Sequence, residues 1–169
     1  MNNIIIRDAE IKDAESICEI YNYYAQNTCV TFETREINAA EIENKIKSAA
    51  GAKLPFYAAV CKNTVAGFIY LSKWNSKSAY DMTKEITIYL RKEYTGKGIG
   101  SALYKKLLSN LDPQSVHCVI AVIYIPNPES VKLNEKFGFK QVSHIKEAGF
   151  KFGKWRDIGH WQLILNRRP

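Results

Sequence analysis

Three alternate glycines, Gly96, Gly98 and Gly100, are the residues of this 169-residue chain whose spacing is best suited to hold a ligand. They follow a β-branched and aromatic run, residues 85–91, that is typical of a strand, and they open a segment with an apolar helical face. Glycine tolerates positive φ and lets the main chain come close to a ligand, and the N–H groups at a helix start attract anions. The loop therefore predicts a site for a pyrophosphate.

Two other phosphate-binding motifs do not fit this loop. A P-loop needs Ser or Thr after its Gly-Lys pair, whereas Lys97 is followed by Gly98. A dinucleotide motif, Gly-x-Gly-x-x-Gly, would need glycine at Ser101 or at Leu103, depending on its first glycine. A glycine-rich turn without a ligand is the alternative that the loop alone leaves open.

Together with Thr95, the loop resembles the Arg/Gln-x-x-Gly-x-Gly/Ala motif by which the GNAT superfamily of N-acetyltransferases binds the pyrophosphate of acetyl-CoA. Thr95 departs from the motif, which usually has Arg or Gln there. A second segment, from Asn127 to Phe139, has a helix N-cap, a proline at the first helical position and a terminal glycine. It resembles the family's segment beside the pantetheine arm. Nearly the whole chain resembles phosphinothricin and methionine sulfoximine N-acetyltransferases.

This resemblance implies acetyl-CoA as cosubstrate, no metal, and direct attack by the primary amine of a small amino-acid-like acceptor in a ternary complex. Glu85 matches the family's general base, which takes a proton from the acceptor's ammonium group. The implied cofactor-binding residues are Thr87, Ile88, Tyr89, Thr95, Gly96, Lys97, Gly98, Ile99, Gly100, Ser101, Asn127, Ser130 and Asn134. The implied acceptor-binding residues are Phe32, Lys77 and Tyr80, with Lys77 where the family has a carboxylate-binding arginine.

Several assignments have alternatives. Glu85 could instead be a surface carboxylate at the start of a strand, paired with Lys84 or another cation. Asn134 stands where the family has a tyrosine or histidine that protonates the leaving thiolate, so the thiolate leaves unassisted or a tyrosine, Tyr104 or Tyr124, supplies the proton. We expect Phe150 and Phe152, which stand where the family often has tyrosine and histidine, to be core residues.

The hydrophobic pattern predicts helices and strands in mixed order. Helices are expected at residues 13–27, 39–50, 100–111 and from 127, and strands at 4–7, 56–61, 66–71, 85–91, 116–124, 140–145 and 158–165. The order indicates an α+β protein with a single domain over residues 1–169. The resemblance implies the GNAT acyl-CoA N-acyltransferase fold, a mixed central sheet flanked by helices. In that fold the strands at 85–91 and 116–124 splay apart into a wedge for the cofactor.

Composition narrows the function classes. The net charge is +7, but the basic residues are dispersed and no nucleic-acid motif accompanies them, so we expect no nucleic-acid partner. Since no apolar run reaches about 20 residues and no signal peptide is recognisable, we expect a cytoplasmic protein without a membrane partner. The four cysteines lie far apart and the three histidines are scattered, which predicts reduced, partly buried thiols and no metal site.

The resemblance also implies a homodimer. Two other functions remain compatible with the sequence. One is a protein or peptide N-acetyltransferase of the same fold, and the other is a non-catalytic acyl-CoA-binding protein.

Overall fold

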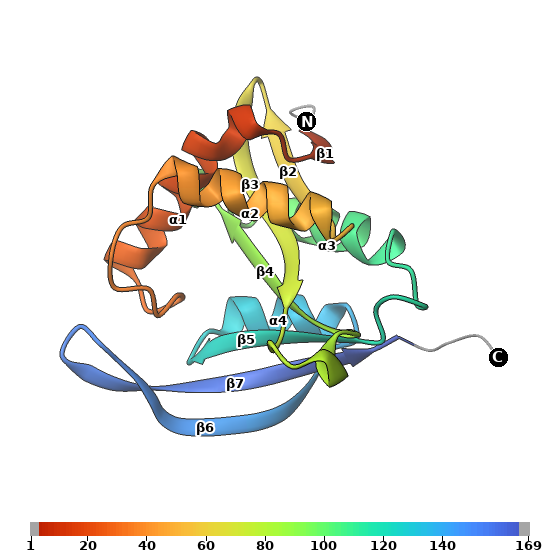
Figure 1. Cartoon of the computed structure of the whole chain (residues 1–169). Coiled ribbons are helices and arrows are strands. Elements are labelled where there is room, and N and C mark those ends of the chain that lie inside the picture. The colour runs from red at the N-terminus through yellow and green to blue at the C-terminus, as the bar shows by residue number, and fades with distance from the viewer. Residues whose placement is uncertain (1–3, 166–169) are drawn as a thin grey trace. The chain divides into compact units, whose positions relative to one another are not determined.

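The computed structural model describes residues 4–165 (Figure 1). Its helices are α1 (Ala14–Asn27), α2 (Ala39–Gly51), α3 (Ile99–Ser109) and α4 (Pro128–Lys136), with one-turn 3-10 helices η1 (Ile11–Asp13), η2 (Ser78–Tyr80) and η3 (Lys92–Tyr94). Its strands are β1 (Ile4–Asp8), β2 (Phe56–Cys61), β3 (Thr64–Lys73), β4 (Thr83–Leu90), β5 (Cys118–Ile125), β6 (Lys140–Lys151) and β7 (Lys154–Ile164). In the described part of the chain the strands form one sheet in the order β1-β2-β3-β4-β5-β7-β6. This mixed sheet with its helices confirms the predicted α+β class.

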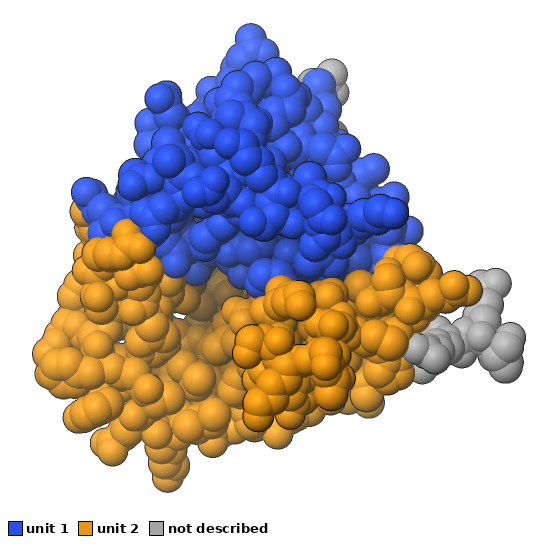
Figure 2. Space-filling view, in the orientation of Figure 1, with its two compact units in different colours: residues 1–23, 36–72, 87–111 blue, residues 24–35, 73–86, 112–169 orange. Residues whose placement is uncertain are grey.

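Two compact units divide the chain, and β4 contributes to both (Figure 2). Unit 1 comprises residues 1–23, 36–72 and 87–111, and unit 2 comprises residues 24–35, 73–86 and 112–169. The single domain expected over residues 1–169 stays a prediction.

Unit 1 is built around the antiparallel strands β1, β2 and β3. Helix α3 packs on β1 and β2, and α2 packs on β2. The core includes Ala58, Phe68, Ile69 and Leu103, each at most 1% exposed. β3 carries Gly67, where an added Cβ would lie 2.3 Å from Leu90 Cδ2 and 2.8 Å from Tyr89 O. A glycine is therefore required for β3 to approach the second half of β4 this closely.

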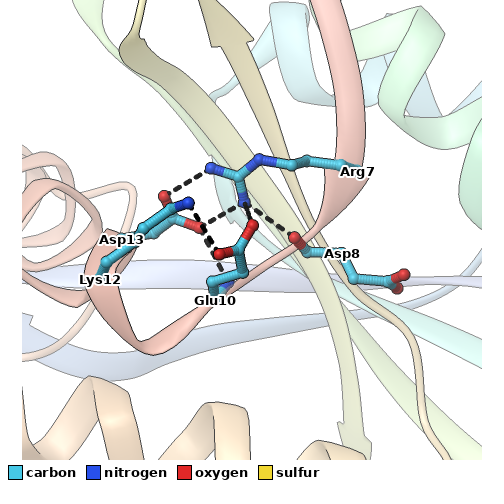
Figure 3. A network of polar contacts seen from close by, with 5 residues as sticks. All are labelled: Arg7, Asp8, Glu10, Lys12 and Asp13. Carbon is cyan, nitrogen blue, oxygen red and sulfur yellow. Dashed lines mark hydrogen bonds and ion pairs between the residues drawn. The ribbon is translucent and has the colours of Figure 1, made fainter.

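A polar network joins β1 to η1, the short helix before α1, in unit 1 (Figure 3). Arg7 forms a bidentate pair with Asp13, Nη1 to Oδ2 at 2.7 Å and Nη2 to Oδ1 at 2.8 Å, and the Glu10 N–H donates to Asp13 Oδ2 at 2.8 Å. Burial by itself would raise the pKa of Asp13, but the hydrogen bonds from Arg7 and Glu10 outweigh burial and hold that pKa below its usual value.

Unit 2 contains the first half of β4 with β5, β7 and β6. β4 pairs with β5 in parallel over three residues only, Thr83–Glu85 against Cys118–Ile120. β5 and β7 pair antiparallel over eight residues, and β7 and β6 form a long hairpin closed by Phe152 (φ 51°) and Gly153 (φ 72°). Positive φ at both central residues gives a turn that suits two-residue hairpins.

The core assignment for Phe150 and Phe152 is wrong, because they are 56% and 55% exposed. β6 and β7 run much longer than the predicted strands at 140–145 and 158–165, and both phenylalanines lie in the extended end of the hairpin. β6 is also an edge strand of the sheet, so fewer elements cover it.

Candidate active site

The glycine loop of unit 1 has the main-chain geometry that an anion site requires. Gly96 (φ 70°) and Gly98 (φ 81°) are both left-handed and exposed, and an added Cβ on either would meet nothing within 4 Å. Gly98 is the N-cap of α3, and the first bond along the helix runs from the Ala102 N–H to Gly98 O at 3.0 Å. The N–H groups of residues 99–101 precede that bond and point out of the helix start.

This arrangement suits a phosphate or pyrophosphate. The N-terminus of an 11-residue helix carries partial positive charge, and no side chain covers the two glycines that lead into it. Lys97 between them is exposed, with its Nζ 5.5 Å from the centre of the Tyr94 ring. Thr95 Oγ1 donates to Lys92 O at 2.8 Å, so this side chain closes the turn before the loop.

Upstream of the loop, the second half of β4 is held by aromatic packing within unit 1. The Tyr89 ring lies 5.4 Å from the Tyr21 ring and 5.7 Å from the Phe68 ring, centre to centre. Since the Tyr89 side chain belongs to this cluster, a ligand would be met by the main chain of residues 87–89. Thr87 and Ile88 are half-buried.

In unit 2, the strand register determines which side chains share a face of the sheet, because alternate residues point to opposite faces. One row contains Glu85, Ile120 and Gln162, and the next row along contains Val122, His160 and Ser143. These residues lie on one face, which we call the Glu85 face. α4 lies on the opposite face, where Trp161 Nε1 donates to Glu135 Oε1 at 3.3 Å.

Glu85 is half-buried, and its neighbour Lys84 points to the opposite face. Lys84 is 8% exposed, donates from Nζ to Asp81 O at 2.6 Å, and has its pKa lowered by burial. This geometry argues against the alternative in which Lys84 holds Glu85 as a surface pair.

His160 is a polar group on the Glu85 face that the sequence did not single out. Its Nδ1 lies 2.5 Å from Ser143 Oγ, and its ring meets the Trp74 ring edge-on at 5.3 Å. Burial lowers the pKa of His160. Val122, beside it in register, is 36% exposed, so this part of the face is open.

The segment that carries Phe32 is fastened to the β6–β7 hairpin within unit 2. An added Cβ on Gly149 would lie 2.4 Å from Phe32 Cε1, so the phenylalanine ring lies directly on this glycine. Lys151 is 4% exposed and donates from Nζ to Thr31 O at 2.8 Å. Burial lowers the pKa of Lys151. The hairpin end thus fixes both Thr31 and Phe32.

The other two expected acceptor residues lie in the segment before β4. Lys77 is exposed and its main-chain N–H donates to Asn75 Oδ1 at 3.1 Å, and Tyr80 in η2 is 44% exposed. The ion pair between Lys73 Nζ and Asp81 Oδ1, at 3.0 Å, closes this segment.

The three residues expected beside the pantetheine arm lie on α4 and its N-cap, with Asn127 and Ser130 at the start of the helix and Asn134 one turn further along. The Ser130 N–H donates to Asn127 Oδ1 at 3.2 Å, which confirms Asn127 as the helix N-cap. Asn134 is 3% exposed and donates from Nδ2 to Ser130 O at 2.9 Å. Of the two tyrosines considered as proton donors, Tyr104 is 1% exposed in unit 1, whereas Tyr124 is half-buried in unit 2.

Each unit therefore gathers one part of the expected set. Unit 1 contains residues 87–89 and the loop at 95–101. Unit 2 contains the expected base, Glu85, the expected acceptor residues, Phe32, Lys77 and Tyr80, and the expected pantetheine residues, Asn127, Ser130 and Asn134. Gly149, Arg156 and His160 were missed, because only the register of β5, β6 and β7 shows what they face. Trp74 was missed because its contact with the His160 ring joins segments far apart in the sequence.

Three further features of the described residues concern metal binding, membrane helices and the cysteines. Residues 4–165 contain no group of three or more His, Cys, Asp or Glu that could hold a metal ion. None of the described helices has the length and apolarity to cross a membrane. All four cysteines are free, and the burial of three of them fits the partial burial expected from the sequence.

Comparison with known proteins identifies the family. Residues 6–160 match the family model of the GNAT acetyltransferase domain. The chain is 34% identical to phosphinothricin N-acetyltransferase of Streptomyces viridochromogenes over 93% of this chain and 85% of the relative. It is 28% identical to the L-methionine sulfoximine/L-methionine sulfone acetyltransferase of Pseudomonas aeruginosa strain PAO1, over 95% of this chain and 94% of the relative.

Two similar solved structures have acetyl-CoA bound. The protein yncA of Salmonella typhimurium, solved with its cofactor acetyl-CoA, has a TM-score of 0.95 at 26% identity, covering 99% of this chain and 96% of that one. A phosphinothricin acetyltransferase of Sinorhizobium meliloti in complex with acetyl-CoA has a TM-score of 0.91 at 33% identity, covering 96% and 88%. The chain therefore belongs to the GNAT acetyltransferase family and is an N-acetyltransferase.

Proposed function

We propose that this enzyme transfers the acetyl group of acetyl-CoA to the primary amine of a small amino-acid-like acceptor of the phosphinothricin or methionine sulfoximine type. The observation that carries the proposal is the pair of left-handed, uncovered glycines, Gly96 and Gly98, at the N-terminus of α3. The named activities of the relatives and the acetyl-CoA in the two similar structures support it.

Acetyl-CoA, when bound, supplies the thioester that the amine attacks. In unit 1, the N–H groups of residues 96–101 would hold the pyrophosphate, and the main chain of residues 87–89 would hold the pantetheine end. In unit 2, Asn127 and Ser130 at the start of α4 and Asn134 further along the helix would contact the pantetheine arm.

Glu85 is the proposed general base. An α-ammonium group has no free electron pair, so one proton must leave before nitrogen attacks the thioester carbonyl, and a half-buried carboxylate can accept it directly or through water. A main-chain N–H within residues 87–89 would stabilise the oxyanion that forms. The CoA thiolate then leaves, either unassisted or with a proton from Tyr124, the more accessible of the two tyrosines considered.

The test is thiol release from acetyl-CoA with phosphinothricin, methionine sulfoximine, a panel of amino acids and peptides. We expect the first two to be acetylated. For Glu85→Gln we expect a kcat about 10²- to 10⁴-fold lower, the usual contribution of a general base, with unchanged acetyl-CoA affinity. Glu93→Gln, at an exposed glutamate of η3, is the matched control and should keep full activity.

Other outcomes of this assay would replace the proposal. Acetylation of peptides alone would indicate a peptide acetyltransferase, and CoA binding without turnover on any amine would indicate a sensor. Full turnover by the Glu85→Gln variant at every pH would remove Glu85 as the base.

We also propose a homodimer and a cytoplasmic location. β6 is an edge strand with exposed apolar side chains, Val142 (54%), Ile145 (45%) and Phe150 (56%), and Trp155 of β7 beside it is 60% exposed. Such a surface favours pairing with a second copy. Sedimentation of the wild type and of a Val142→Lys, Trp155→Lys variant tests the dimer, which the variant should lose. The four free cysteines fit a reducing compartment.

A further inference from the structure

Arg156 on β7 has a donor that nothing in the structure satisfies. Its Nε is buried and has no hydrogen-bond partner, and among the described residues it alone of the buried side-chain nitrogen and oxygen atoms lacks one. The guanidinium Cζ lies 5.9 Å from the centre of the Tyr124 ring, so the group is held against an aromatic ring. An arginine stays protonated at any working pH, and a buried unpaired donor is costly. An acceptor oxygen supplied by a ligand would remove this cost.

The strand register places Arg156 among the acceptor-side residues of unit 2. Arg156 is the direct partner of Gly149, so its side chain is on the face where the Phe32 ring lies over that glycine. Along β7, Arg156 also alternates in phase with His160 and Gln162, which places it on the Glu85 face.

The position along the strand indicates which end of an acceptor Arg156 could reach. Gln162 is in the row of Glu85, and six residues of strand, about 20 Å, separate it from Arg156. Glu85 would act on the acceptor's amine, and the α-carboxylate is attached to the same carbon as that amine. Arg156 is therefore placed to reach the opposite end of the acceptor, the tip of its side chain.

We propose that Arg156 Nε donates a hydrogen bond to an oxyanion at the tip of the acceptor's side chain, such as a phosphinate or a distal carboxylate. Arginine is suited to such groups because its planar fork matches their geometry. Arg156 thereby selects glutamate-like acceptors over apolar ones of the same length. This inference rests on the proposed function and assigns a specificity-determining residue within it.

The experiment compares phosphinothricin, which has a distal phosphinate, with methionine, whose side chain ends without oxygen. Arg156→Gln removes the charge, and Arg156→Lys keeps a cation but loses Nε. For both variants we expect kcat/KM for phosphinothricin to fall about 10- to 100-fold, as for a lost charged hydrogen bond. The kcat/KM for methionine and the KM of acetyl-CoA should stay within about twofold of their wild-type values. Calorimetric dissociation constants replace kcat/KM where turnover is too slow.

Lys154→Gln is the matched control, since Lys154 is exposed, lies on the same strand face and carries the same charge. It should leave the preference for phosphinothricin unchanged. An unchanged preference in both Arg156 variants, or an equal loss with both acceptors, would overturn the assignment, because an equal loss reports a structural role or a contact with the shared α-carboxylate. A wild-type enzyme that acetylates no amine in the panel would instead defeat the proposed function itself.

Discussion

Substitution of Gly98 by alanine is the most direct test of how the α3 loop binds its ligand. The residue has φ 81°, and its added Cβ would meet nothing within 4 Å, so the whole effect must come from the backbone and not from a clash. An L-residue in the left-handed region costs about 1–2 kcal/mol. If the loop keeps its shape, the free energy of unfolding falls by that amount. If it relaxes, the N–H groups of residues 99–101 turn away and the dissociation constant for CoA rises about 5- to 30-fold.

Calorimetry with CoA measures the loss of binding free energy, and thermal unfolding of the free protein measures the loss of stability. The two losses should together account for the backbone cost of the left-handed alanine. Gly51→Ala is the control, because Gly51 in α2 also has open space around its Cβ but no positive φ. That variant should be slightly more stable, by up to about 1 kcal/mol, with unchanged CoA affinity. A Gly98→Ala protein with wild-type stability and wild-type CoA affinity would refute the account of the loop.

Three further substitutions test two close contacts of glycines near the site and the Arg7–Asp13 pair in unit 1. Gly149→Ala should raise the KM of the acceptor but not that of acetyl-CoA, because its Cβ would lie 2.4 Å from Phe32 Cε1 and must displace that ring; equal changes in both constants would contradict this. Gly67→Ala, with its Cβ 2.8 Å from a main-chain oxygen of β4, should lower the free energy of unfolding by about 1–3 kcal/mol in a denaturant titration and lower kcat as well. Asp13→Asn should cost about 2–3 kcal/mol at pH 7 through its bonds with Arg7. Since the folded pKa of Asp13 is depressed, that stability is present above the ordinary value of 3.8 and is lost as pH falls through the folded pKa, so wild type and variant should converge in acid.

The parts of the molecule that the sequence predicted well depend on neighbours in the chain. Glycine tolerates positive φ, so a strand-to-helix turn at Gly96, Gly98 and Gly100 could be predicted from the sequence alone, whereas the N-cap position and left-handed φ of Gly98 are seen only in the structure. Asn127 followed by Pro128 carries its capping signal in the same way. The length of the β6–β7 hairpin could not be predicted by this reasoning, because pairing with a partner strand extends both strands through polar stretches that look like loop.

The residues that the sequence missed are those whose roles depend on pairing between distant segments. Gly149 looks like an ordinary turn glycine until the Phe32 ring, more than a hundred positions earlier, is found lying on it. Arg156 is one of many scattered cations in a chain of net charge +7, and only its register opposite Gly149 and its buried Nε distinguish it.

The cofactor motif could be predicted from neighbouring residues and the acceptor residues could not, and the reason lies in the chemistry of the two ligands. The cofactor has a fixed pyrophosphate, which main-chain N–H groups can hold in a short local motif. In the proposed function, an acceptor side chain would instead be recognised by side chains of unit 2, which project from one face of β5, β6 and β7 together with the segment bearing Phe32. Single substitutions at Arg156, His160 or Gly149 would then change the acceptor while the glycine loop stays the same. A survey of variants at these three positions should therefore alter acceptor preference without altering the KM of acetyl-CoA, and a parallel loss of both would show that the two functions are not separable.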